Sequence, residues 1–163
     1  CSAMSEFNIK YMEKALELAR EAFQDDEVPV GAVIVRNGEI VATGRNRREK
    51  EKNALLHAET DAINNACKVL GGWRLWQCEL FVTLEPCPMC AGAIINSRIK
   101  KVTFGAYDNK AGSFGSVINF NDLPYNHKPE IIGGEYENEC AQLLSNFFAD
   151  LREKRRNAVK NSL

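Results

Sequence analysis

The sequence predicts an α/β fold, a three-layer α/β/α sandwich around a mixed sheet of about five strands. Its 163 residues, 45% of them hydrophobic, suffice for one domain with a sizeable core. An amphipathic helix comes first, then a hairpin, and then helices alternate with strands. No repeat or low-complexity tract divides the chain, so we expect one domain over residues 4–163. Residues 1–3 precede the first methionine, Met4, and we expect them to be a cloning remnant.

The chain opens with a helix and a hairpin. Over residues 5–23, apolar side chains recur at helical spacing, with charges on the opposite face. Two β-rich runs, residues 31–36 and 39–43, then flank Asn37 and Gly38, which form the strongest two-residue hairpin signal. The sheet therefore opens with an antiparallel pair.

Beyond the hairpin, helices and strands alternate and are joined by crossovers. The polar stretch 44–53 contains five Lys or Arg residues and no apolar side chain, which predicts a long surface loop. The later elements are expected as a helix over about 58–69 that ends at Gly71 and Gly72, a strand at 79–84, a short helix at Pro88–Ser97, a strand at Lys101–Ala106, a loop at 108–116, a strand at Glu130–Ile132 and a helix from 135 to about 156.

The net charge is −1, so the chain lacks the overall basic character of many nucleic-acid-binding proteins. From Arg152 onward, however, five Lys or Arg residues accompany a single acid, Glu153. This tail is either a phosphate-contacting arm or a solvated helix end whose cations suit the helix dipole. The apolar runs are too short to cross a bilayer and no secretory signal precedes the first helix, so we expect a cytoplasmic protein without a membrane partner.

Six cysteines in a chain without a secretory signal favour metal binding or catalysis over disulfides. Cys67, Cys78 and Cys140 have apolar neighbours, and we expect ordinary core burial for them. Cys87 and Cys90 stand three apart at the start of a predicted helix. This spacing places both sulfurs on one face, where the helix N-terminus favours the thiolate form.

His57 supplies the third ligand of a predicted zinc centre. Zinc prefers sulfur and imidazole nitrogen, and catalytic sites keep three protein ligands and an open position for water. Glu59 can face the same metal only where a helix begins, because residues two apart on a regular helix point in different directions. We predict one zinc ion per subunit, held by His57, Cys87 and Cys90, with Glu59 moving protons as general acid and base.

Each motif alone has an ordinary interpretation. A lone His-x-Glu before an apolar run is typical of a helix start, and a lone Cys-Pro-x-Cys after a strand is typical of a thioredoxin-like redox pair. A redox pair does not require His57 and Glu59, and a structural zinc site requires a fourth protein ligand. The other histidine, His127, is isolated, and we expect it at the surface or in a hydrogen bond. The two motifs together favour a catalytic site.

The combination of H-x-E with P-C-x-x-C resembles the signature of zinc deaminases. From Met4 onward, nearly the whole chain is similar to the bacterial tRNA adenosine deaminases, which convert the wobble adenosine to inosine. The zinc motifs are shared with guanine and cytosine deaminases, whereas the loop at 104–115 and the long basic last helix favour the tRNA enzymes. The matching stretches are residues 27–33, 44–46, 57–59, 83–93, 97–99, 104–106 with Asp108, Lys110 and Gly112, 139–141, 143–145 and 147–148.

The resemblance implies a cytidine deaminase-like fold, a homodimer, and the tRNA anticodon loop as partner. It implies that His57, Cys87 and Cys90 hold zinc and that Glu59 shuttles protons while hydroxide attacks C6 of a flipped-out adenine. The residues it implies for substrate binding are the Glu59 backbone N–H with Leu84, Glu85 and Pro86 in the base pocket, Asn46 on the base, Asp108 on a ribose hydroxyl, and Lys110, Phe147, Phe148 and Arg152 on flanking nucleotides.

Alternatives stay open for these contacts and for the function. Phe147 and Phe148 also suit a core position, and Lys110 suits a solvated loop. The zinc site would equally serve a free-base guanine or cytosine deaminase, or a zinc- or thiol-containing binding module without catalysis. Glu59 argues against the binding module, and the basic tail argues against the free-base enzyme. Salt-sensitive tRNA binding would separate these functions, because phosphate contacts release counterions.

Overall fold

The computed structural model describes residues 6–162, so the expected remnant at residues 1–3 lies outside the described chain. The strands are β1 (Gly31–Arg36), β2 (Glu39–Arg45), β3 (Cys78–Leu84), β4 (Lys101–Ala106) and β5 (Glu130–Ile132). The helices are α1 (Glu6–Gln24), α2 (Arg48–Glu51), α3 (Ala58–Leu70), α4 (Pro88–Ser97) and α5 (Glu137–Asn161), with a 3-10 turn at Phe120–Asp122.

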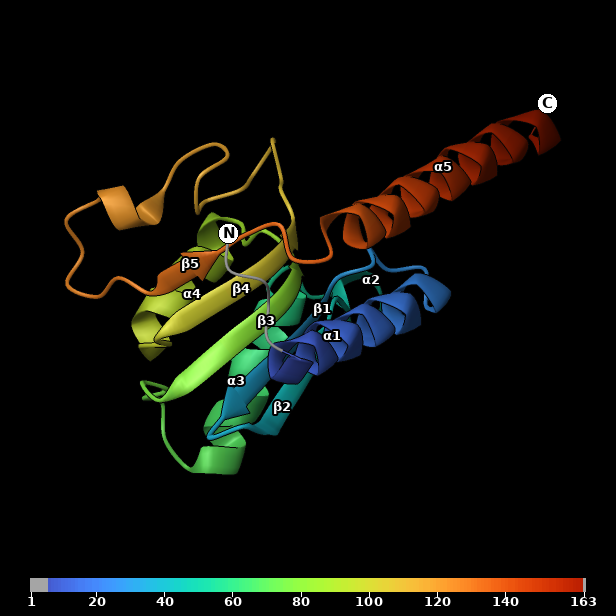
Figure 1. Cartoon of the computed structure of the whole chain (residues 1–163). Coiled ribbons are helices and arrows are strands. Elements are labelled where there is room, and N and C mark those ends of the chain that lie inside the picture. Colours follow the sequence, from blue (N-terminus) through green and yellow to red (C-terminus); the bar gives the residue numbers. More distant parts are fainter. Residues whose placement is uncertain (1–5, 163) are drawn as a thin grey trace.

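A five-stranded mixed sheet lies at the centre, in the order β2-β1-β3-β4-β5 (Figure 1). β1 is antiparallel to both β2 and β3, whereas β3, β4 and β5 run parallel. The β1–β2 turn uses Asn37 and Gly38, with φ values of 52° and 77°. Such positive φ values are what a type I′ hairpin turn requires. The predicted sheet, antiparallel at its start and crossover-connected afterwards, is confirmed.

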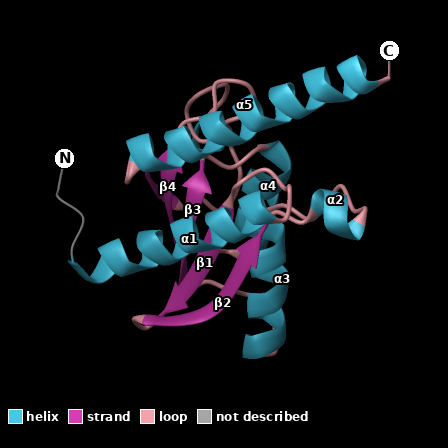
Figure 2. Ribbon diagram, turned by 90° about the vertical axis from the view of Figure 1, so that its right-hand side faces the viewer, coloured by secondary structure: helices cyan, strands magenta, loops and turns pink. Residues whose placement is uncertain are grey.

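Helices cover both faces of this sheet (Figure 2). On one face, α3 and α4 pack through small and aliphatic side chains such as Ala62 and Ile94, which meet Leu80 of β3. On the other face, α1 and α5 join a second buried cluster that includes Met12 and Phe81. The alternation of Leu80 and Phe81 between the two clusters follows the two-residue period of a strand. The three-layer α/β/α sandwich is therefore confirmed.

The prediction of one long surface loop over residues 44–53 is wrong. β2 continues to Arg45 in its pairing with β1, and residues 48–51 form the short helix α2. Asn46, between the two, is only 6% exposed. The composition of this stretch does not indicate its structure, because the residues that stabilise it lie far away in the sequence. Glu27, for example, accepts hydrogen bonds from backbone N–H groups of α2.

β2 and α3 approach each other closely at Gly44. A Cβ atom at this position would lie 2.3 Å from the carbonyl oxygen of Ala58 and 2.4 Å from the backbone nitrogen of Ala62. This contact sets the first turn of α3 directly against the end of β2. Within residues 6–162, no helix is both long and apolar enough to span a membrane.

Candidate active site

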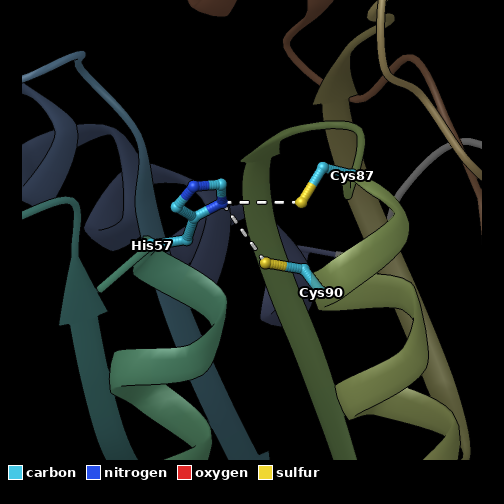
Figure 3. A group of neighbouring side chains, drawn as sticks. All are labelled: His57, Cys87 and Cys90. Atoms are coloured by element: carbon cyan, nitrogen blue, oxygen red, sulfur yellow. Dashed lines mark hydrogen bonds between the residues drawn. The ribbon is translucent and has the colours of Figure 1, made fainter. Parts of the chain in front are cut away.

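Two helix N-termini meet beside the carboxyl end of β3. His57 is the N-cap residue of α3 and Cys87 is the N-cap residue of α4, both with extended backbone. Cys90 lies in the first turn of α4. Pro88 begins this helix, where a backbone N–H would have no hydrogen-bond acceptor within the helix, so proline fits there without loss. Figure 3 shows the His57 ring, which comes from α3, directed toward the two sulfur atoms from α4. This is the helix-entry arrangement that the sequence predicts.

The three side chains are spaced as a tetrahedral zinc site requires. His57 Nδ1 lies 3.5 Å from Cys87 Sγ and 3.5 Å from Cys90 Sγ. Zn–N bonds of about 2.0 Å and Zn–S bonds of about 2.3 Å at tetrahedral angles separate nitrogen and sulfur by about 3.5 Å. The residues therefore fit zinc, and within the described part of the chain they form the one cluster of three metal-ligating residues.

The electrostatics of the cluster favour a thiolate at Cys87. A hydrogen bond from Cys90, followed by one from His57, lowers the pKa of Cys87 to about 4 against the opposing effect of burial. The hydrogen bond to Cys87 raises the pKa of His57. The hydrogen bond to Cys87 and then burial raise the pKa of Cys90. Cysteine ligands bind a divalent metal as thiolates, so metal binding displaces the thiol protons.

Glu59, the second residue of α3, is buried beside these ligands and is 4% exposed. Desolvation, with a smaller contribution from the nearby Cys87, raises the pKa of Glu59 to about 7. A carboxyl group with a pKa near neutrality can both accept and donate a proton, which general acid–base catalysis needs. The Cys90 side chain forms a hydrogen bond with the same carboxylate.

A cavity of about 160 Å³ opens onto His57, Glu59 and Cys87. Pockets for drug-sized ligands measure roughly 300–1,000 Å³, so this one suits a small group such as a single base. The other residues that line it are Val28, Val30, Asn46, Arg48, Ala58, Leu84, Glu85, Asp108 and Ala111. The structure thus places four residues expected at the substrate, Asn46, Leu84, Glu85 and Asp108, beside the metal cluster.

The other expected contact residues lie outside this cavity. Pro86 is buried, and its carbonyl accepts a hydrogen bond from the Ser113 N–H at 2.9 Å. Lys110 and Arg152 are exposed and line neither this cavity nor the groove that adjoins it. The expectation that Pro86 lines the base pocket is not met, because the backbone turns there to begin α4 and directs the next residue, Cys87, inward.

A groove of about 480 Å³ adjoins the cavity and shares Val28, Asn46 and Arg48 with it. Phe147 and Phe148 of α5 line this groove together with Leu151 and Arg155. Phe147 is buried at 7% exposure and packs edge-on against Phe23 at 5.6 Å, as a core residue does. Phe148 is 42% exposed. The two neighbouring phenylalanines therefore have different surroundings, and only Phe148 presents its ring to solvent.

Sequence reasoning missed five residues of the cavity wall: Val28, Val30, Arg48, Ala58 and Ala111. The two valines lie in the matching stretch 27–33, but their apolar character indicated only core. Arg48 was hidden in a stretch that read as a solvated loop. No spacing signal marks such residues, because their place at the site depends on how distant segments pack.

The remaining chemically active residues conform largely to expectation. His127 donates a hydrogen bond to the Ile99 carbonyl at 2.7 Å. Cys78 and Cys140 are buried, and Cys67 is partly buried against the same core as Cys78. All three thiols are free, and burial raises the pKa of each.

Fold and site together define a deaminase. The family model of the MafB19-like deaminases matches residues 7–152. The tRNA-specific adenosine deaminase of Bacillus subtilis (strain 168) is 49% identical over 152 residues, which cover 93% of this chain and 94% of that protein. The tRNA-specific adenosine deaminase of Haemophilus influenzae is 45% identical over 154 residues, 93% of this chain and 89% of that protein.

A solved structure from a study of A-to-I editing by tRNA:A34 deaminases at the wobble position is 43% identical, with a TM-score of 0.81. The match covers 83% of this chain and 99% of that one. The chain therefore belongs to the tRNA-specific adenosine deaminase family. The resemblance found in the sequence and the cytidine deaminase-like fold are both confirmed.

Proposed function

We propose that this protein is an enzyme that hydrolytically deaminates the wobble adenosine of tRNA to inosine. The observation that carries the proposal is the buried carboxyl of Glu59 beside the His57, Cys87 and Cys90 cluster, at a cavity sized for one base. The similarity to tRNA-specific adenosine deaminases at 45–49% identity supports the choice of substrate.

His57, Cys87 and Cys90 would hold one zinc ion per subunit and leave a fourth position for water, as catalytic zinc sites do. When bound, zinc acidifies water so that it can attack the ring carbon that carries the exocyclic amine. The sulfur donors of Cys87 and Cys90 and the imidazole of His57 suit zinc better than magnesium or calcium, which prefer oxygen ligands.

Glu59 moves the protons of the reaction. It takes one from the attacking water and delivers it to N1 of the adenine, while the new C–O bond forms at C6. It then carries the second proton from the added oxygen to the amino group, so that the C6–N bond breaks and ammonia leaves. Water is consumed, inosine and ammonia are formed, and Glu59 returns to its starting state.

The base reaches the cavity by leaving the stack of its anticodon loop, which costs less than flipping a base out of a duplex. Asn46 and Asp108 line the cavity; Asn46 would hydrogen-bond the base and Asp108 would bind a ribose hydroxyl. Phe148 and Arg155 line the adjoining groove and suit a flanking nucleotide through stacking and phosphate contact. Lys110 and Arg152, both exposed, would contact nucleotides farther out.

We further propose a cytoplasmic homodimer with one deaminase domain per subunit, on the strength of the family resemblance. Size-exclusion chromatography with light scattering measures the mass in solution. A mass near twice 18.3 kDa supports the dimer, and a monomer at micromolar concentration contradicts it.

The test of the function uses zinc-loaded protein and an anticodon stem-loop with adenosine at the wobble position. We expect inosine at that position, detected by reverse transcription as a change from adenosine to guanosine. In a matched stem-loop with the adenosine moved by one nucleotide, we expect almost none. Equal conversion at both positions, or none at either, would overturn the proposed substrate.

A further inference from the structure

Glu85 is a buried carboxylate that holds the loop after β4. It directly precedes Pro86 in the chain and is 1% exposed. Its Oε1 accepts a hydrogen bond from the Asp108 N–H at 3.1 Å. Its Oε2 accepts from the N–H groups of Phe114 at 3.2 Å and Ser116 at 3.1 Å. The Ser116 hydroxyl also donates to this carboxylate. One side chain therefore joins both ends of the segment 108–116.

The packing around Glu85 is equally close. A Cβ atom at Gly112, in the middle of this segment, would lie 2.3 Å from Cδ of Glu85. The segment thus wraps around the carboxylate. Asp108 and Ala111, the two residues of the segment that line the base cavity, take their position from this arrangement.

Glu27 has the same relation to the other polar wall. It is 1% exposed, and its two oxygens accept hydrogen bonds from the N–H groups of Glu49 at 2.9 Å and Lys50 at 3.0 Å. The N-cap residue of α2 offers no side-chain hydrogen bond, so Glu27 supplies acceptors from outside the helix. Asn46 and Arg48, which line both the cavity and the adjoining groove, belong to this segment.

Neither carboxylate forms an ion pair among the residues that the structure describes. A buried charge is costly unless hydrogen bonds compensate it. Here the compensation comes from backbone N–H groups and a hydroxyl of two irregular segments. The two groups of hydrogen bonds share no residue, and each ends at a different part of the cavity wall.

We propose that Glu27 and Glu85 are positioning residues that fix the two polar walls of the base cavity independently of each other. The inference rests on the proposed function for its consequence in catalysis, but not for its structural content. Neither wall contains a metal ligand or Glu59. Loss of either carboxylate therefore weakens base binding in the ground state and the transition state alike, which raises KM and leaves kcat nearly unchanged.

The experiment compares Glu27→Gln, Glu85→Gln and the double variant with wild type. The matched control is Glu79→Gln, a carboxylate on β3 that is partly exposed and faces Lys101 at 3.9 Å. Zinc content, amide hydrogen exchange, and kcat and KM on the stem-loop are measured. An amide replaces one acceptor oxygen by a donor, so hydrogen bonds to that oxygen are lost.

We expect Glu85→Gln to accelerate exchange in residues 108–116 and Glu27→Gln to do so in residues 46–51, each at least about tenfold and without effect on the other segment. KM should rise about tenfold in each variant, with kcat within about threefold of wild type, and the two KM factors should multiply in the double variant. Zinc content should stay unchanged. The Glu79→Gln control should alter none of these quantities.

Unchanged exchange in both segments would overturn the inference, and so would a fall in kcat at constant KM. If Glu85→Gln does not fold, Ser116→Ala removes only the hydroxyl contact, and faster exchange confined to 108–116 is then the expected result. Exchange is read without substrate. Segment-specific exchange in a protein that leaves the stem-loop untouched would therefore support the positioning role while the proposed function fails.

Discussion

At the residue scale, the proposed metal binding depends on His57 Nδ1, which lies 3.5 Å from each of the Cys87 and Cys90 sulfur atoms. We predict that Cys90→Ser lowers bound zinc to well under half of the wild-type content, because a hydroxyl is a poor zinc ligand, and that deamination falls in proportion. Metal analysis after gel filtration measures the zinc. Cys67→Ser is the control, since Cys67 lies away from the cluster and should keep full zinc. Full zinc in Cys90→Ser would contradict this ligand set.

If Glu59 is the proton shuttle, its substitution should slow deamination without changing the zinc content. Glu59→Gln keeps the shape of the side chain but cannot carry protons, so we expect kcat to fall by roughly 10²–10⁴-fold with zinc content unchanged. Single-turnover inosine formation on the stem-loop measures the effect. A variant with full zinc and more than a tenth of the wild-type rate would exclude Glu59 as the shuttle.

The cluster of His57, Cys87 and Cys90 could be predicted from the sequence because the spacing of these residues carries the geometry. Cys87 and Cys90 are three residues apart and so share a helix face, whereas His57 and Glu59 can face one point only where a helix begins. The structure has both arrangements. Arg48 could not be predicted in this way. Its position at the cavity follows from the packing of a segment whose own residues give no apolar period.

At the scale of elements, the site is held together by close contacts between strand and helix. Gly44→Ala would force a Cβ atom against backbone atoms of α3 that cannot shift cheaply. We predict a loss of about 3 kcal/mol in the free energy of unfolding, toward the upper end of overpacking effects. Urea denaturation monitored by circular dichroism measures it.

Gly92→Ala in α4 is the matched control for this substitution. A Cβ atom at Gly92 meets nothing within 4 Å. Because alanine loses less conformational freedom than glycine in a helix, this variant should be unchanged or more stable by about 0.5–1 kcal/mol. Equal stability of both variants would show that β2 and α3 are not held by the contact at Gly44.

Element boundaries could be predicted where local signals determine them. The hairpin at Asn37 and Gly38 and the end of α3 at Gly71 follow from residues that tolerate positive φ. α5 begins at Glu137, two residues later than predicted, because Tyr136 adopts the left-handed conformation with φ of 57°. A tyrosine gives no sequence signal for that conformation, since bulky residues rarely adopt it.

At the scale of the whole molecule, α5 connects the core to the groove beside the cavity. The helix packs against the sheet at its start, and its last turns project beyond the body (Figure 1). Every residue from 152 to 162 is exposed. Although the net charge of the chain is −1, the exposed end of α5 is locally basic, as expected from the charge distribution. Composition alone could not place this surface relative to the site.

Adjacent phenylalanines on α5 should affect binding and stability differently. Phe148→Ala removes an exposed ring from the groove, and we predict about tenfold weaker stem-loop binding at unchanged stability, since stacking contributes about 1–3 kcal/mol per base. Phe147→Ala removes a buried ring packed on Phe23 and should cost about 3–5 kcal/mol of stability. Fluorescence anisotropy and thermal melts measure the pair. An equal loss of stability in both variants would assign both rings to the core.

The proposed zinc site of His57, Cys87 and Cys90 would serve an RNA-bound adenosine and not a free base. The most direct test is the ratio of kcat/KM for the wobble-adenosine stem-loop to that for free guanine, cytosine and adenine, with one zinc-loaded preparation. We predict a ratio above about 10³, because the contacts proposed along α5 and the groove would act only on a polynucleotide. Faster turnover of any free base than of the stem-loop would contradict the claim and leave a free-base deaminase with the same zinc chemistry.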